Sequence, residues 1–146
     1  MKIESPSFKS GASIPSKFTC QGDDVNPLLT IQDVPDQAQS LVLIMDDPDA
    51  PAGIWVHWLL WNISPHTSEI SENSVPNKAV QGKNSWGKST YGGPCPPTGT
   101  HRYFFKCYAL DTTLSISSSA NKDQLENAMQ GHVVAAAELM ATYKKR

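Results

Sequence analysis

The segment Ile-Trp-Val-His-Trp-Leu-Leu-Trp-Asn-Ile at residues 54–63 is apolar at almost every position, and His57 is its only ionisable residue. A strand with one face in solvent alternates apolar and polar residues, whereas a strand covered on both faces is continuously apolar. We therefore expect residues 54–63 to form a central strand of a sheet that is covered on both sides.

The segments around this strand are typical of a β-rich protein. Leu41–Met45 is a second apolar run of strand length, and it ends in the acidic, proline-containing segment 46–51. We expect a third strand at His101–Leu110 and a short one near Ala79 and Val80. Eleven prolines and nine glycines are spread along the chain and divide it into such short runs.

Helical spacing occurs only after these strands. Asn121 and Gln124 have the spacing of a helix N-cap pair, and they precede a short apolar stripe formed by Leu125, Ala128 and Met129. Gly131 interrupts the stripe, and Val133, Ala137 and Met140 resume it at helical spacing. The sequence therefore predicts a mainly β fold with short helices near the C-terminus.

Length and charge narrow the class of protein. The chain has 146 residues, which suits one domain over residues 1–146 with a single core. Twelve Lys and Arg against 14 Asp and Glu give a formal charge of -2 without a long run of either sign, so we expect no nucleic acid partner. No segment is apolar enough to span a membrane or to act as a secretory signal, and we expect a cytoplasmic location.

The three cysteines, Cys20, Cys95 and Cys107, are odd in number and lack C-x-x-C spacing. This pattern is typical of neither a disulfide framework nor a cysteine-rich metal site. We expect all three thiols to be reduced. Cys95 stands between two prolines with no helix N-terminus to lower its pKa, and we expect it not to act as a nucleophile.

The segment from Tyr91 to Tyr103, Tyr-Gly-Gly-Pro-Cys-Pro-Pro-Thr-Gly-Thr-His-Arg-Tyr, predicts a rigid binding rim. Proline fixes φ, and glycine lets the backbone approach a ligand closely. In the strand that follows, His101, Tyr103 and Phe105 share a face, which places the polar groups of the first two beside the apolar ring of the third. Such a surface suits a small polar ligand.

His57 leaves several interpretations open. Alternation along the strand places it on one face with Trp55, Leu59 and Trp61, where its N–H needs an acceptor. It is either a hydrogen-bonded core histidine or a pocket histidine oriented by a nearby carboxylate. A facial metal triad with His101 and Asp47 is a further alternative, but the sequence has no HxH or HxxxH pair to support it, and we expect neither a metal nor a cofactor.

Two motif matches fail in their context. The acidic turn is no EF-hand, because Pro51 and Trp58 would occupy the fifth and twelfth ligand positions. Residues 82–89 (Gly-Lys-Asn-Ser-Trp-Gly-Lys-Ser) match the Walker A pattern, but neither a buried strand before them nor a helix after them is expected. We expect no nucleotide binding, and no effect of Lys88→Ala on anion affinity.

Taken in order, these residues resemble the phosphatidylethanolamine-binding protein family, and specifically its bacterial and archaeal Raf kinase inhibitor-like branch. The resemblance rests on Asp-Pro-Asp-Ala-Pro at 47–51, His57, Gly-Pro-Cys-Pro-Pro at 93–97, and His-Arg-Tyr at 101–103. It implies an antiparallel β-sandwich with a pocket at one end that takes phosphate, phosphorylated head groups, acetate or similar small anions.

The resemblance also implies the two walls of the pocket: Asp47, Asp49, Pro51 and His57 on one side, and Gly93, Pro94, His101 and Tyr103 on the other. We expect the two histidines, Tyr103 and loop amides to hold the anion without catalysis, while Asp47 and Asp49 orient the histidines. Arg102 points to the opposite strand face, which predicts an ion pair with a carboxylate.

Two other functions stay open. The first is inhibition of a serine protease or a kinase through the pocket rim, and the second is a hydrolase of unknown substrate. No residue is assigned a catalytic role. The sequence determines neither the physiological ligand nor whether the chain forms a homodimer.

Overall fold

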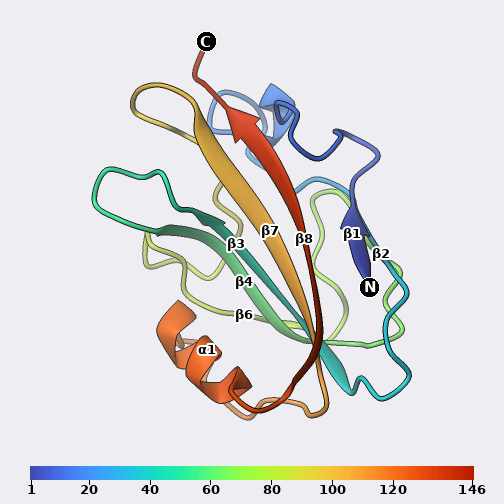
Figure 1. The fold of residues 1–146 in the computed structure, drawn as a ribbon. Coiled ribbons are helices and arrows are strands. Elements are labelled where there is room, and N and C mark those ends of the chain that lie inside the picture. Colours follow the sequence, from blue (N-terminus) through green and yellow to red (C-terminus); the bar gives the residue numbers. More distant parts are fainter.

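The computed structural model describes residues 1–146 and contains two antiparallel β-sheets that pack face to face (Figure 1). The smaller sheet has the strand order β1 (Lys2–Glu4), β2 (Leu29–Gln32) and β5 (Glu69–Ile70). The larger sheet has the order β6 (Val80–Gln81), β4 (Trp55–Ile63), β3 (Ser40–Asp47), β7 (His101–Leu110) and β8 (Val133–Tyr143). The helical elements are the short 3-10 helix η1 (Ser16–Phe18) and the α-helix α1 (Lys122–Met129). The predicted antiparallel β-sandwich is confirmed.

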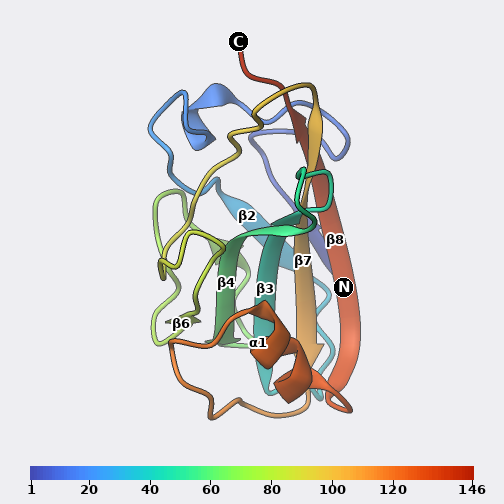
Figure 2. The same cartoon turned by 90° about the vertical axis from the view of Figure 1, so that its left-hand side faces the viewer.

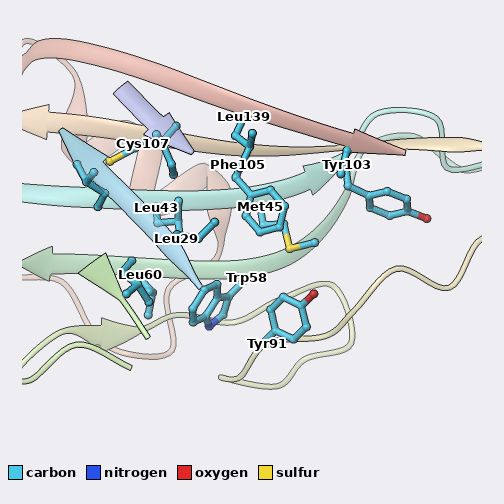
Figure 3. Packing of buried hydrophobic residues seen from close by; sticks show 14 of the residues in the cluster. Leu29, Leu43, Met45, Trp58, Leu60, Tyr91, Tyr103, Phe105, Cys107 and Leu139 are labelled. Carbon is cyan, nitrogen blue, oxygen red and sulfur yellow. The ribbon is translucent and has the colours of Figure 1, made fainter. Parts of the chain in front are cut away.

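The larger sheet is covered on both faces. The main core lies between the sheets, where Leu29 of β2 packs with Leu43 and Met45 of β3 (Figure 3). A second apolar cluster lies on the other face of the sheet under α1, which Figure 2 shows on the side away from β1 and β2. All eight residues of β3 are buried: the apolar run Leu41–Met45, as expected for a strand covered on both sides, and the polar residues Ser40, Asp46 and Asp47 at its ends.

The helix prediction holds for α1 and fails beyond it. Asn121 and Gln124 form a capping box, in which each side chain accepts a hydrogen bond from the other residue's backbone N–H, at 3.0 and 2.9 Å. Val133, Ala137 and Met140, which we expected to resume the helical stripe, lie in strand β8 instead. β8 pairs with β7 along its whole length, and this pairing outweighs the weak helical spacing of three apolar residues.

A β-bulge in β4 changes the direction of His57. Val56 and Trp58 pair with two consecutive residues of β3, so that His57 is the extra residue on its strand. The prediction that His57 shares a face with Trp61 is therefore wrong. Trp61 packs under α1, whereas the ring of His57 lies edge-on to Tyr103 in the main core, with 5.2 Å between ring centroids.

Cys20 and Cys95 form a disulfide bond across 75 residues of sequence, contrary to the expectation of three reduced thiols. The loop after η1 folds back onto the proline-rich loop, and the N–H of Cys20 donates to the carbonyl of Pro94 at 3.1 Å. The spacing of the cysteines along the sequence does not indicate this contact. Cys107 alone is a free thiol.

Candidate functional site

A cavity of about 620 Å³ opens at the end of the sandwich where β3 ends and where β4 and β7 begin. Six of the eight residues predicted for the site line this cavity: Asp47, Pro51, His57, Gly93, His101 and Tyr103. The other two, Asp49 and Pro94, do not line it. The ends of three strands contribute Asp47, Trp55, His57, His101 and Tyr103 to the cavity, and loops supply the rest of its 19 lining residues.

Asp47 and His101 form a buried hydrogen-bonded pair in the cavity wall. The Nδ1–H of His101 donates to Oδ2 of Asp47 at 2.7 Å, and Oδ1 of Asp47 accepts the N–H of Asp49 at 2.7 Å. Both oxygens of Asp47 thus accept hydrogen bonds within the protein, and neither is left unpaired towards a ligand. Nε2 of His101 has no partner in the protein and is left for the cavity.

Asp49 serves a different purpose from the one expected. Its two carboxylate oxygens accept the Nε and Nη2 hydrogens of Arg102, both at 2.9 Å, and the N–H of Arg102 donates to it as well. This bidentate pair lowers the pKa of Asp49 to about 2. The ion pair predicted for Arg102 is confirmed, but Asp49 orients no histidine and instead fixes the turn after β3 to the start of β7.

His57 is oriented by a backbone carbonyl rather than by a carboxylate. Its Nδ1 lies 2.6 Å from the carbonyl oxygen of Gly92, and because a carbonyl only accepts, Nδ1 carries the hydrogen. Burial lowers the pKa of His57, and the hydrogen bond to Gly92 opposes this only in part. In the neutral ring Nε2 then carries no hydrogen and is a hydrogen-bond acceptor.

The two glycine amides expected to hold an anion are already used. The N–H of Gly92 donates to the carbonyl of His57 at 3.1 Å, and the N–H of Gly93 donates to Oδ1 of Asp24 at 2.7 Å. A Cβ atom at Gly92 would clash with the ring of Trp86, and one at Gly93 would clash with backbone next to η1. The packing of the protein itself therefore requires glycine at both positions.

The Walker-like segment is a loop organised by one asparagine. Oδ1 of Asn84 accepts the N–H groups of Trp86 and Lys88 at 2.9 and 3.0 Å, and its Nδ2 donates to the carbonyl of Thr90 at 2.9 Å. Gly87 has a φ of +75° within this turn. No helix follows, as predicted, so the backbone cannot form a P-loop.

Sequence reasoning nevertheless missed the contribution of this loop to the site. Asn84, Trp86 and Lys88 all line the cavity, which removes the reason for expecting Lys88 to be irrelevant to anion affinity. The signal was available in part, because an asparagine three residues before a glycine in a polar loop is typical of a side-chain-capped turn. Nothing in the sequence indicated that the turn faces His57.

Two further aromatic residues of the wall were also missed. Trp55 packs edge-on against Trp86, with 5.4 Å between ring centroids. The hydroxyl of Tyr91 donates to the carbonyl of Phe18 at 2.7 Å and ties the proline-rich loop to η1. Figure 3 shows Tyr91 and Tyr103 at the same end of the main core, beside Trp58 and Met45.

Residues 4–144 match the sequence model of a protein family, and the description of that family is phosphatidylethanolamine-binding protein. The chain belongs to the phosphatidylethanolamine-binding protein family. A UPF0098 protein of Methanothermobacter thermautotrophicus is 43% identical over 99% of both chains, and one of Chlamydia pneumoniae is 47% identical over 99% of both.

Solved structures agree with this membership. A phosphatidylethanolamine-binding protein homologue from Chlamydia trachomatis is 46% identical and superposes with a TM-score of 0.96, covering 99% of this chain and 97% of that one. YbcL of Escherichia coli, described as a new member of the mammalian family, is 28% identical with a TM-score of 0.93, covering 99% and 98%.

In this member of the family, Tyr103 has an unusual hydroxyl group. The side chain is 0% exposed, it lines the cavity, and its hydroxyl has no hydrogen-bond partner in the protein. Burial, and after it the negative charges of Asp47 and Asp49, raise the pKa of Tyr103, so the hydroxyl keeps its hydrogen and is an unused donor in the cavity wall.

The structure contains no group of three or more His, Cys, Asp or Glu side chains positioned to hold a metal ion. His57, His101 and Asp47 therefore do not form the facial triad weighed from the sequence. In this family member Nδ1 of each histidine is bonded within the protein, to Gly92 and to Asp47. No helix in the structure combines the length and the apolarity needed to cross a membrane.

Proposed function

We propose that the cavity binds a small anion, phosphate or a phosphorylated head group, without a catalytic step. The observation that carries this proposal is the unpaired hydroxyl of Tyr103, buried in the cavity wall. Leaving a buried donor without a partner costs about 1–3 kcal/mol. A ligand oxygen placed in the cavity would supply the missing acceptor.

The groups of the cavity wall that have no partner in the protein support an anionic ligand, although the lining also holds two carboxylates. Lys88 lines the cavity and forms no ion pair with any carboxylate of the chain. The two carboxylates of the lining, Asp24 and Asp47, both accept hydrogen bonds within the protein. The groups left for a ligand are therefore a cation, the Tyr103 hydroxyl and the Nε2 atoms of the two histidines.

The test is a pair of matched tyrosine variants, titrated with inorganic phosphate by calorimetry and unfolded with urea. Tyr103→Phe removes a hydroxyl that has no protein partner, so stability should stay the same or rise, while phosphate affinity falls by roughly tenfold or more, as for the loss of a hydrogen bond to a charged group. Tyr91→Phe removes a hydroxyl that is bonded to Phe18, so stability should fall while phosphate affinity changes little.

The opposite pattern would contradict the proposal. If Tyr103→Phe destabilises the protein and leaves phosphate affinity unchanged, the hydroxyl has a structural role. If the parent protein binds no phosphate at all, the proposal is refuted.

A rim-based inhibitor of a serine protease or a kinase is a second proposal, favoured by two exposed apolar side chains. Ile54 is 55% exposed and Trp86 is 44% exposed, and Trp86 forms part of the cavity wall. Ile54→Ser would abolish inhibition of a susceptible protease or kinase while leaving phosphate affinity unchanged. Inhibition that survives this change, or that is absent in the parent across a panel of both enzyme classes, argues against the rim.

A further inference from the structure

His57 presents a hydrogen-bond acceptor to the cavity, and its hydrogen-bonding geometry fixes this role. Nδ1 donates to the carbonyl of Gly92, so the only remaining nitrogen is Nε2, which has no partner in the protein. His57 lines the cavity, and its ring is held edge-on by Trp86 and Tyr103, with 5.1 and 5.2 Å between centroids. The ring cannot turn over without giving up the bond to Gly92.

The groups around the ring do not force a proton onto it. Of the carboxylates nearby, Asp24 accepts the N–H of Gly93 and Asp47 accepts from His101. The other titratable groups of the cavity are His101, Lys88 and the hydroxyls of Tyr91 and Tyr103. Asp46, whose charge also favours a protonated ring, is held in ion pairs with Lys106 and Lys122. Burial lowers the pKa of His57 in agreement with this arrangement, so the neutral ring is the form at neutral pH.

We propose that the cavity selects an oxyanion that still carries a proton, such as hydrogen phosphate, and discriminates against sulfate. This inference rests on the proposed anion-binding function and names its ligand class. The P–OH group of the ligand donates to Nε2 of His57, while its charged oxygens accept hydrogen bonds from Tyr103 and Lys88. No covalent bond forms or breaks.

Sulfate and hydrogen phosphate have the same shape and the same charge near neutral pH, and they differ in this one hydrogen. A sulfate oxygen placed against Nε2 sets one lone pair against another in a buried site. Sites with a fixed hydrogen-bonding group reject ligands that lack the complementary group, and we expect roughly 10- to 100-fold weaker binding of sulfate here.

The experiment is calorimetric titration of the full chain with inorganic phosphate, sulfate and methyl phosphate at about pH 8, where a phosphate monoester has lost its second proton (pKa about 6) and hydrogen phosphate has kept one. Phosphate should bind at least about tenfold more tightly than sulfate and methyl phosphate. Methyl phosphate should recover affinity as the pH falls through about 6, where it regains its proton.

Two variants separate charge from proton recognition. His57→Gln replaces the fixed acceptor by a carboxamide that can also donate, so the ratio of phosphate to sulfate affinity should fall towards one. Lys88→Met removes only the cation, so both affinities should fall and the ratio should persist.

Each outcome is decisive. Equal affinities of the parent for phosphate and sulfate overturn this inference and leave the proposed function standing, whereas binding of neither anion refutes both. If His57→Gln does not fold, NMR of the His57 ring nitrogens in the parent at about pH 8 tests the inference instead. An unprotonated Nε2 in the free protein is expected, and a protonated one overturns the inference.

Discussion

Removing the disulfide should be among the most damaging changes outside the core. Cys20 and Cys95 are separated by 75 residues, and loop closure of that length stabilises a folded chain by about 4 kcal/mol in the chain-entropy account. For a chain of this size each kcal/mol corresponds to about 2–4 °C, so the double variant Cys20→Ser/Cys95→Ser should melt roughly 10–15 °C lower than the oxidised parent.

The assay is thermal unfolding of parent and variant with and without a reductant. Reductant should lower the melting temperature of the parent to that of the double variant and leave the variant unchanged, which controls for effects of the serine side chains. Cys107 does not interfere, because burial raises the pKa of its thiol to about 12 and keeps it unreactive in the folded state. If denatured parent protein that has not been exposed to a reductant contains three free thiols, the disulfide is refuted.

The remaining predictions concern the loop that carries Lys88 and the turn after β3. Asn84→Ala removes three side-chain hydrogen bonds from a buried position and should destabilise the protein by about 2–3 kcal/mol in urea unfolding, with a loss of phosphate affinity because Lys88 is no longer held at the cavity. Asp49→Asn breaks the exposed pair with Arg102 and should lower the melting temperature by only about 1–3 °C at neutral pH. Because the folded pKa of Asp49 is lowered to about 2, that difference is present above about pH 4 and should vanish as the pH falls through about 2 in pH-dependent melting curves.

Features of the fold that depend on neighbours in sequence could be predicted. The central strands follow from continuous apolar runs, and the start of α1 follows from the pairing of Asn121 with Gln124. The ion pair of Arg102 follows from strand alternation, because its side chain lies on the face opposite His101. Each of these depends on spacings of a few residues.

Features that depend on distant contacts could not be predicted. The bulge at His57 arises from pairing with β3, and Cys20 meets Cys95 only because two loops fold together. The same holds for the glycine amides of the proline-rich loop, which local reasoning left free for a ligand and which the protein uses for Asp24 and for His57. The helical interpretation of Val133, Ala137 and Met140 failed because pairing with β7 is stronger than local spacing.

The most direct test of the central claim, that this cavity is the anion site, is an NMR titration of the parent with phosphate at neutral pH. The claim predicts saturable shifts of the His57 and His101 ring nitrogens and of the Trp86 indole N–H, all with one dissociation constant. It predicts no shift at His132, which lies outside the cavity and is hydrogen-bonded to Asp111. Shifts that grow linearly with phosphate, or that appear at His132 and surface lysines but not at His57, would contradict it.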